Sequence, residues 1–445
     1  MARFSNGILR RPQDEPFRRA TRQSETRCKV IARKGYGLEM SSILTNTSAM
    51  VALQTLKQIN FNLSKAQDEI STGKAIATSK DNSAVWAISK VMESDVAGFK
   101  AISSSLALGQ STVATGRNAA EKVTELLNRV KEKIVNAQED NVDRVKIQEE
   151  IVALRNQIGL ITGAAQFNGL NFLSNTSKTA GTGTVDVLAS LDRSGSSVKA
   201  SSISITKQDL GTGAATVGLT ATNVGAAATI AAGATGTFAT FTGTPVAGNS
   251  YRITNIGGTA LTSPVIYVAR EGDTLASVVS ELATRVGYAA KLQGINVSFG
   301  TTGTAGVLTL TNNTAAGVVS TAAHSQQSAA GVVDGIIGGG LEYLTRLDVT
   351  TSNGAEAGLV LIEGLIQTSI KAAASFGAAQ GRIEIQSSFV SSLMDSLRAG
   401  IGSLIDADME EASARLQALQ VQQQLGVQAL SIANQAPQTI LSLFR

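Results

Sequence analysis

The sequence predicts a mainly α protein in which long heptad helices from both chain ends form an elongated coiled-coil bundle, with a variable α+β or β-rich outer domain inserted between them. Three observations predict this class. Apolar residues recur at alternating steps of three and four near both ends, which is the pattern of helices that pack on helices. The middle of the chain instead carries short β-rich runs and a Gly-rich, charge-free stretch. Aromatic residues are only 4% of the chain, which suits long Ala/Leu/Ile helices better than a compact enzyme core.

Three helices are expected before residue 174, each with a buried stripe of three/four spacing that we call a seam. The first seam stops at Thr72-Gly73, a helix-ending pair, and consists of Ala49, Ala52, Leu56, Ile59, Leu63, Ala66 and Ile70. The second is interrupted at Gly109 and Gly116 and consists of Leu106, Val113, Ala120, Val123, Leu127, Val130, Ile134 and Ala137. The third follows the Asp140-Asn141 break and consists of Ile147, Ile151, Leu154, Ile158, Ile161 and Ala165. The Asn-Gly pair in "QFNGL" then predicts a tight turn.

The middle region is expected to be a separate α+β domain. Strands are predicted at "VIYVAR" (265–270), "INVSF" (295–299) and "GVLTLT" (306–311), and a helix capped by Asp273 lies between the first two. Residues 210–251 carry no charge and are rich in Ala, Gly and Thr, so low-complexity disorder stays open as an alternative for this stretch.

Helical patterning returns after Asn353-Gly354. This seam misses only Ser369 and Gln386 and consists of Ile362, Leu365, Ala372, Phe376, Ala379, Ile383, Val390, Leu393 and Leu397. Gly400 and Gly402 are expected to loosen the helix before the last segment begins.

The last segment, residues 416–444, contains no charged residue. Its seam is interrupted at Gln423 and Gly426 and runs through Met409, Ala412, Leu416, Leu419, Leu430 and Ala433. Asp408 is expected to cap this helix, and Pro437 is expected to end it. Because the glutamines keep each apolar run short of the ~18 residues that span a membrane, the segment is predicted to pair with the 49–70 helix and with other protein, without membrane insertion.

Composition and charge exclude several function classes. The net charge is +4, but residues 1–39 hold ten Lys or Arg and four Asp or Glu, so the rest of the chain carries a net −2. No basic face is therefore indicated, and no nucleic-acid partner is expected. The single Cys28 excludes a disulfide framework, and the single His324 lies in a Ser/Ala/Gln-rich segment.

No catalytic or cofactor motif stands out. The glycine clusters at 179–184 and 335–340 fit neither a P-loop nor a dinucleotide fingerprint. Asp406, Asp408 and Glu410 would alternate around a helix and not converge on a metal. We expect no enzyme, metal or cofactor, with a hydrolase built from isolated Ser and Asp residues as the alternative.

Several stretches, in order, resemble bacterial flagellin, in a form closest to the alphaproteobacterial branch. The resemblance covers nearly all of residues 40–174 and 356–445, and its stretches are "ISTGKAIATSKDNSAVWAISKVM" (70–92), "LLNRVKEKIVNAQ" (126–138), "IQEEIVALRNQI" (147–158), "QFNGLNFL" (166–173), "FGAAQGRI" (376–383), "SLIDADMEEASA" (403–414) and "ANQAPQTILSLF" (433–444). Residues 264–312 also resemble the small ββαββ module inserted in some flagellar filament proteins, a weaker match. The closing stretch is nearer to the filament form than to the hook–filament junction protein, which is the alternative.

The resemblance implies a filament subunit whose two ends form an inner core, with a helical rod around it and the variable middle facing solvent. The expected domains are a basic leader (1–39), the N-terminal inner helix (40–80), the N-terminal rod (81–175), the variable surface domain (176–355), the C-terminal rod (356–402) and the C-terminal inner helix (403–445). The expected self-assembly residues are Leu56, Ile59, Leu63, Ile70, Leu416, Leu419, Leu430 and Ala433. The partners that the resemblance implies are the chain itself, the filament cap, hook–filament junction proteins and a flagellar export chaperone.

Two further expectations come from the resemblance. "MSSILTNTSAM" from Met40 is similar to the family's usual N-terminus, so residues 1–39 are expected to be disordered or a misassigned start; intact-mass analysis of filaments would find these residues if this is wrong. A faint likeness of the leader to an organellar transit peptide is the alternative. Arg129, Glu132 and Lys133 match the region that helps many flagellins bind the animal Toll-like receptor, but Lys133 stands where a Leu is expected.

Overall fold

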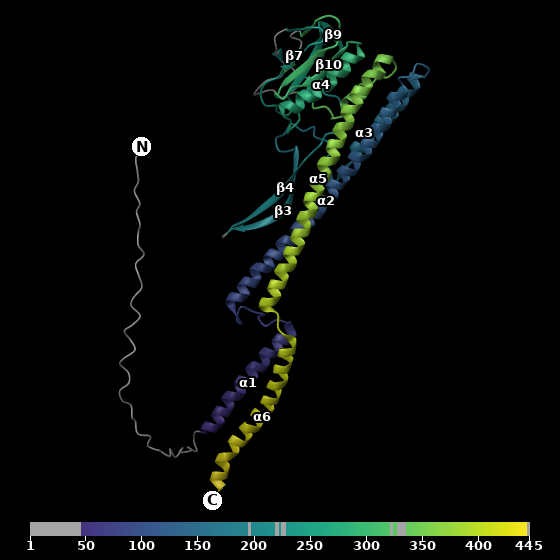
Figure 1. The fold of residues 1–445 in the computed structure, drawn as a ribbon. Coiled ribbons are helices and arrows are strands. Elements are labelled where there is room, and N and C mark those ends of the chain that lie inside the picture. The colour runs from purple at the N-terminus through teal and green to yellow at the C-terminus, as the bar shows by residue number, and fades with distance from the viewer. Residues whose placement is uncertain are drawn as a thin grey trace, which may run out of the picture. The chain divides into compact units, whose positions relative to one another are not determined.

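A computed structural model describes residues 46–194, 197–218, 222–223, 228–320, 324–326 and 335–442. The predicted leader and the expected start at Met40 lie outside these residues. The chain divides into two compact units. Unit 1 contains the described residues up to Lys74 and from Ala407 onward, and unit 2 is Ala75–Asp406. The mainly α class with a strand-containing insert is confirmed (Figure 1).

Unit 1 consists of α1 (Thr47–Thr72) and α6 (Met409–Ser442). As predicted, α1 ends at Gly73, which has the left-handed φ of 70° that glycine adopts without steric cost. The carboxylate of Asp408 accepts hydrogen bonds from the backbone N–H of Glu410 (2.9 Å) and of Glu411 (3.3 Å), so its predicted capping role is confirmed. The prediction that Pro437 ends the helix is wrong, because α6 continues to Ser442.

The long helices of unit 2 are α2 (Ser83–Asn136), α3 (Arg144–Ala164) and α5 (Ser352–Ile405). The helices α2 and α5 lie side by side and antiparallel, since Thr124 contacts Ser369 and Gly116 faces Phe376 (Figure 1). Every apolar residue predicted for the second seam is buried with no exposed area. The apolar stretch in α5 makes it the one helix among the described residues whose length and composition would suit a membrane span, and its buried stripe packs on α2.

At positions where the predicted seams lack an apolar side chain, the structure shows contacts with another segment of the chain. At Gly109 an added Cβ would lie 2.6 Å from a methyl carbon of Val187, so the neighbouring strand fills the space that a side chain would take. Ser369 is fully buried, and its hydroxyl donates to the carbonyl of Ala120 (3.1 Å). Gln386 donates its side-chain amide to the carbonyl of Ala189 (2.9 Å). The helix α5 continues past the glycines at 400 and 402, which are predicted to loosen it, and ends at Ile405.

In its described residues, the insert between α3 and α5 consists of antiparallel strands, the helix α4 and a short 3₁₀ helix. Its elements are β1 (Gln166–Phe167), β2 (Leu170–Asn171), β3 (Thr184–Ser194), β4 (Ser197–Thr206), β5 (Thr222–Asn223), β6 (Ala228–Ile230), β7 (Thr235–Thr240), β8 (Ser250–Ile256), β9 (Thr259–Val268), α4 (Leu275–Leu292), β10 (Val297–Thr301), β11 (Val307–Asn312), β12 (Val318–Ser320), β13 (His324–Gln326) and the short 3₁₀ helix η1 (Glu342–Arg346). The sheets have the orders β5-β13-β8-β9 and β10-β11-β7, with two-stranded pairs β1-β2, β3-β4 and β12-β6. Strands are therefore present in the described part of 210–251.

The local predictions for the insert are largely confirmed. The run β8-β9-α4-β10-β11 contains the three predicted strands and the predicted helix and has the order ββαββ, but its first strand, β8, lies before the 264–312 range of the resemblance. The Asn168-Gly169 turn has φ of 51° and 79°, so both central residues are left-handed, as a tight hairpin requires. One detail is wrong: the cap of α4 is Thr274, which exchanges hydrogen bonds with Ser277, while Asp273 accepts from the Tyr267 hydroxyl.

The hairpin β3-β4 packs on the rod helices, although it lies inside the predicted variable domain. Val187 and Ala189 of β3 are buried, and Leu191 approaches Gly98 of α2 so closely that an added Cβ would lie 2.7 Å away. The hairpin therefore belongs to the core of the rod in unit 2 and does not depend on the sheets of the insert for its burial.

Candidate self-assembly surface

The helices α1 and α6 of unit 1 form an antiparallel pair. Near one end the backbone N–H of Ala407 donates to the carbonyl of Gly73 (3.0 Å), and near the other Asn46 donates to the carbonyl of Ala433 (2.8 Å). Between these points, Gly426 of α6 faces Leu56 of α1, where an added Cβ would lie 3.2 Å from the leucine methyl. The predicted pairing of the two chain ends is therefore present within one chain.

The predicted assembly residues all lie on the facing sides of this pair. Each is buried or half-buried, whereas most of the residues next to them in the helices are exposed, and the set is Leu56, Ile59, Leu63, Ile70, Leu416, Leu419, Leu430 and Ala433. Gln423 and Gly426 continue the seam in phase and do not interrupt it. The amide of Gln423 donates to the side-chain oxygen of Asn60 (2.7 Å), so the polar residue in the seam has a partner on the other helix.

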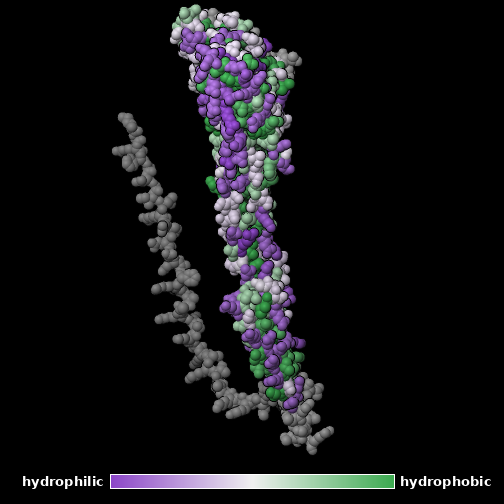
Figure 2. Space-filling model, turned by 90° about the vertical axis from the view of Figure 1, so that its right-hand side faces the viewer, coloured by the Kyte–Doolittle hydropathy of each residue, from purple (hydrophilic) through white to green (hydrophobic). Residues whose placement is uncertain are grey.

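A second apolar stripe lies on the opposite side of α6. It consists of Val421, Leu425 and Ile432, which are 55%, 57% and 68% exposed, and we call it the outer stripe. Its spacing of four and then seven residues places the three side chains on one helix face, about half a turn from the seam. Met50 and Phe61 are similarly exposed on α1. Figure 2 shows hydrophobic side chains gathered over this part of the chain.

The outer stripe was missed as a distinct surface because the seam pattern dominates the sequence. The signal was present, since Val421, Leu425 and Ile432 keep helical spacing out of phase with the seam. A helix that is apolar on two opposite sides needs a partner on each side. Within unit 1, α1 covers only one of them.

The charged residues of α6 lie near its N-terminus, before the outer stripe begins. Glu410 and Glu411 lie in the first turn of α6, where carboxylates favour the positive end of the helix, and Glu411 pairs with Arg415 (2.8 Å). From residue 416 to 435 the described side chains of α6 are uncharged. A surface without charge can be buried against another protein without desolvating an ion.

The residues of the predicted receptor-contact region lie together on α2. Arg129 is exposed and pairs with Glu125 (2.8 Å), and Glu132 is exposed. The pKa of Glu125 is lowered, first by a hydrogen bond from Lys122 and by its positive charge, and then by the charge of Arg129. Lys133 is half-buried, and its ammonium pairs with Glu150 of α3 (2.5 Å). The position at which an apolar contact is expected is therefore a charged pair.

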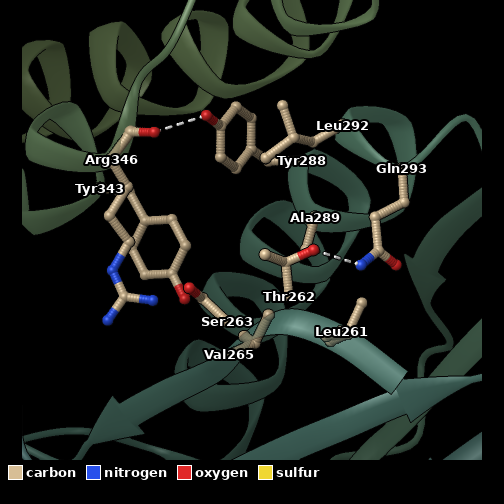
Figure 3. A pocket seen from close by; sticks show the side chains of 10 residues that line it. All are labelled: Leu261, Thr262, Ser263, Val265, Tyr288, Ala289, Leu292, Gln293, Tyr343 and Arg346. Atoms are coloured by element: carbon tan, nitrogen blue, oxygen red, sulfur yellow. Dashed lines mark hydrogen bonds between the residues drawn. The ribbon is translucent and has the colours of Figure 1, made fainter. Parts of the chain in front are cut away.

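A cavity of about 290 Å³ in the insert is lined partly by polar side chains, some of which are hydrogen-bonded within the chain (Figure 3). The Tyr288 hydroxyl donates to the carbonyl of Arg346 (2.6 Å), and the Gln293 amide donates to the Thr262 hydroxyl (2.8 Å). Its ten lining residues include no carboxylate, histidine or cysteine, so they provide no acid–base pair. Among the residues that the structure describes, no three His, Cys, Asp or Glu side chains are grouped as metal ligands would be.

Two family patterns match the chain. The pattern described as the bacterial flagellin N-terminal helical region matches residues 43–178, and the one described as the bacterial flagellin C-terminal helical region matches residues 359–444. Similar relatives include flagellin A and flagellin B of Rhizobium meliloti, each 36% identical over 91% of this chain and 100% of the relative. A flagellin of Brucella melitensis is 30% identical over the same shares of the two chains.

Solved structures give a weaker likeness. The flagellar hook associated protein-3 from Legionella pneumophila is 13% identical, with 71% of this chain and 98% of that chain covered and a TM-score of 0.34.

Proposed function

The chain belongs to the bacterial flagellin family, and on that premise we propose that unit 1 is the surface through which its copies assemble. The chain is a structural protein, a self-polymerising subunit of the extracellular flagellar filament that serves swimming motility. The alternative of a hook–filament junction protein is not favoured, because the curated relatives that match along their full length are flagellins.

The observation that supports this proposal is the two-sided apolar character of α6. The seam holds α6 against α1 and leaves the outer stripe in water. Isolated helices are marginal in water, so most of their stability must come from packing on other elements. A neighbouring copy that covers Val421, Leu425 and Ile432 would bury the apolar surface that one chain leaves exposed. The seam residues Leu56, Ile59, Leu63, Ile70, Leu416, Leu419, Leu430 and Ala433 would then set the shape of this surface and not make the contact between copies themselves.

The two units would have different roles in the filament. Unit 2 has its own buried seams along α2, α3 and α5, which suits a rod whose stability does not depend on unit 1. We place the inner filament helices at 40–80 and 403–445, the rod at 81–175 and 356–402, and the variable surface domain at 176–355, except that the β3-β4 hairpin within this last range packs with the rod. The exposed sheets of the insert would face solvent, where surface segments tolerate variation.

The partners outside the filament are proposals that rest on the family. We propose that the chain is exported through the flagellar type III channel with an export chaperone, and that it contacts hook–filament junction proteins and the filament cap. Arg129, Glu132 and Lys133 would form the contact region for a host innate receptor.

Deleting residues 416–445 tests the assembly role of unit 1. We expect a soluble monomer that keeps the helices of unit 2, because the seams of α2, α3 and α5 are intact, and that forms no filament. Circular dichroism would measure the helix content, and electron microscopy would score the filaments. A truncated chain that still polymerises would refute the assembly role, and loss of most of the helix would show that α6 belongs to an ordinary folding core.

A further inference from the structure

Asn46 connects the two helices of unit 1 through both ends of its side-chain amide. Its carbonyl oxygen accepts from the backbone N–H of Ala49 (3.0 Å), which caps the N-terminus of α1. Its amide nitrogen donates to the backbone carbonyl of Ala433 in α6 (2.8 Å). One side chain therefore caps one helix and binds the backbone of the other.

The carbonyl of Ala433 is available because of Pro437. In an α-helix the carbonyl of residue 433 accepts from the N–H of residue 437, and proline has no N–H. Since α6 continues through Pro437 to Ser442, this carbonyl lies inside the helix and not at its end. Asn46 supplies the donor that proline lacks.

We propose that Asn46 and Pro437 form a register lock, defined as the pairing of the Asn46 amide with the carbonyl that Pro437 leaves free. The seams of α1 and α6 repeat every seven residues in small and aliphatic side chains, so a slip of one heptad would keep apolar residues facing one another. A slip toward Gly426 would place Asn46 opposite a carbonyl that already accepts from its own helix, and a slip in either direction would leave the Ala433 carbonyl without a donor. Single polar positions select register in helix pairs for this reason.

The lock has a consequence for assembly, and this step rests on the proposed function. The register decides at which level along α6 the exposed apolar residues of α1, such as Met50 and Phe61, lie relative to the outer stripe. A heptad slip moves one helix by about 10 Å relative to the other and would offer neighbouring copies a different apolar surface. The contact between Gln423 and Asn60 in the middle of the pair is made in the same register.

A measurement of register in the monomer tests the lock apart from polymerisation. Spin labels on cysteines placed at the exposed Gln54 and Gln428, in a Cys28→Ser background, report the distance between α1 and α6 by pulsed electron resonance. Asn46→Asp keeps the capping oxygen and removes the amide donor. Asn46→Ser does the same without a charge and is too short to reach across. Pro437→Ala restores the helix's own N–H donor to the Ala433 carbonyl.

We expect a single distance for the parent chain and, for both Asn46 variants, a second population at a longer distance or a distribution broadened by unpairing, because residues 54 and 428 lie opposite each other in the parent register. Combining either variant with Pro437→Ala should produce no further change beyond that of Pro437→Ala alone, because the carbonyl then has its own donor. A single parent-like distance in the Asn46 variants would overturn the lock. An equal effect of the Asn46 variants with and without Pro437→Ala would overturn it as well. Since both readouts come from monomers, they stand independently of whether unit 1 assembles the filament.

Discussion

Replacing Leu425 by Asp is expected to block polymerisation without unfolding the monomer. Leu425 is 57% exposed, and full burial of a leucine side chain contributes roughly 1.5–3 kcal/mol. Covering its exposed part in a filament therefore contributes about 1–1.5 kcal/mol per subunit. An aspartate does not make this burial contribution, and burying its charge costs up to several kcal/mol. The contact between copies should therefore weaken by about 3 kcal/mol or more. Because every 1.4 kcal/mol is about tenfold in an equilibrium constant, the critical concentration should rise by about 100-fold or more.

Sedimentation of polymer at increasing protein concentration measures the critical concentration, and circular dichroism measures the unfolding of the monomer. Leu425→Met is the volume-conserving control and should polymerise close to the parent chain. Gln422→Asp places the same charge at an exposed position of α6 outside the outer stripe and should change the critical concentration much less. If Leu425→Asp polymerised at the parent concentration, the outer stripe would not be an assembly contact. A loss of monomer helix in this variant would mean that Leu425 stabilises the fold itself.

Three further predictions follow from the structure. Replacing 214–338 by a short linker should preserve filaments seen by electron microscopy, because Gly213 and Gly339 are already hydrogen-bonded neighbours (2.8 Å). A wider replacement of 180–350 should instead lower the melting temperature, since it removes the β3-β4 hairpin that packs on α2. Gly116→Val should destabilise unit 2 by about 1–3 kcal/mol in urea unfolding, because a Cβ added at residue 116 would lie 3.2 Å from the Cβ of Phe172. Gly163→Ala is the control and should not destabilise unit 2, because a Cβ added at residue 163 would have no atom within 4 Å. Lys133→Leu should raise receptor activation in reporter cells above that of the parent chain, which is expected to be poor; an equal response would show that the charged pair with Glu150 does not limit the contact.

The period of the apolar residues was sufficient to predict the helices. Gly73 and Asp408 were also readable, because a left-handed helix end and a carboxylate cap are local features with local signals. The predicted cap of α4, Asp273, is wrong because the local signal fits two adjacent residues equally well. Both Asp273 and Thr274 suit a cap, and the Tyr267 hydroxyl, which binds Asp273, comes from a strand that the local sequence does not reveal as a partner.

The sequence by itself determined which faces of the helices are buried, because heptad spacing is a property of neighbouring residues along one helix. The tertiary structure alone decided what occupies the positions where the seams lack an apolar side chain. Val187 fills the space at Gly109, Ala120 accepts from Ser369, and Asn46 serves the carbonyl that Pro437 leaves free. Each of these partners lies far along the chain, and whether a glycine, a serine or a proline interrupts a helix pair depends on the atom that the distant segment brings to it. For this reason the sequence predicts that Pro437 ends the helix, whereas in the structure Pro437 lies inside the continuous helix α6.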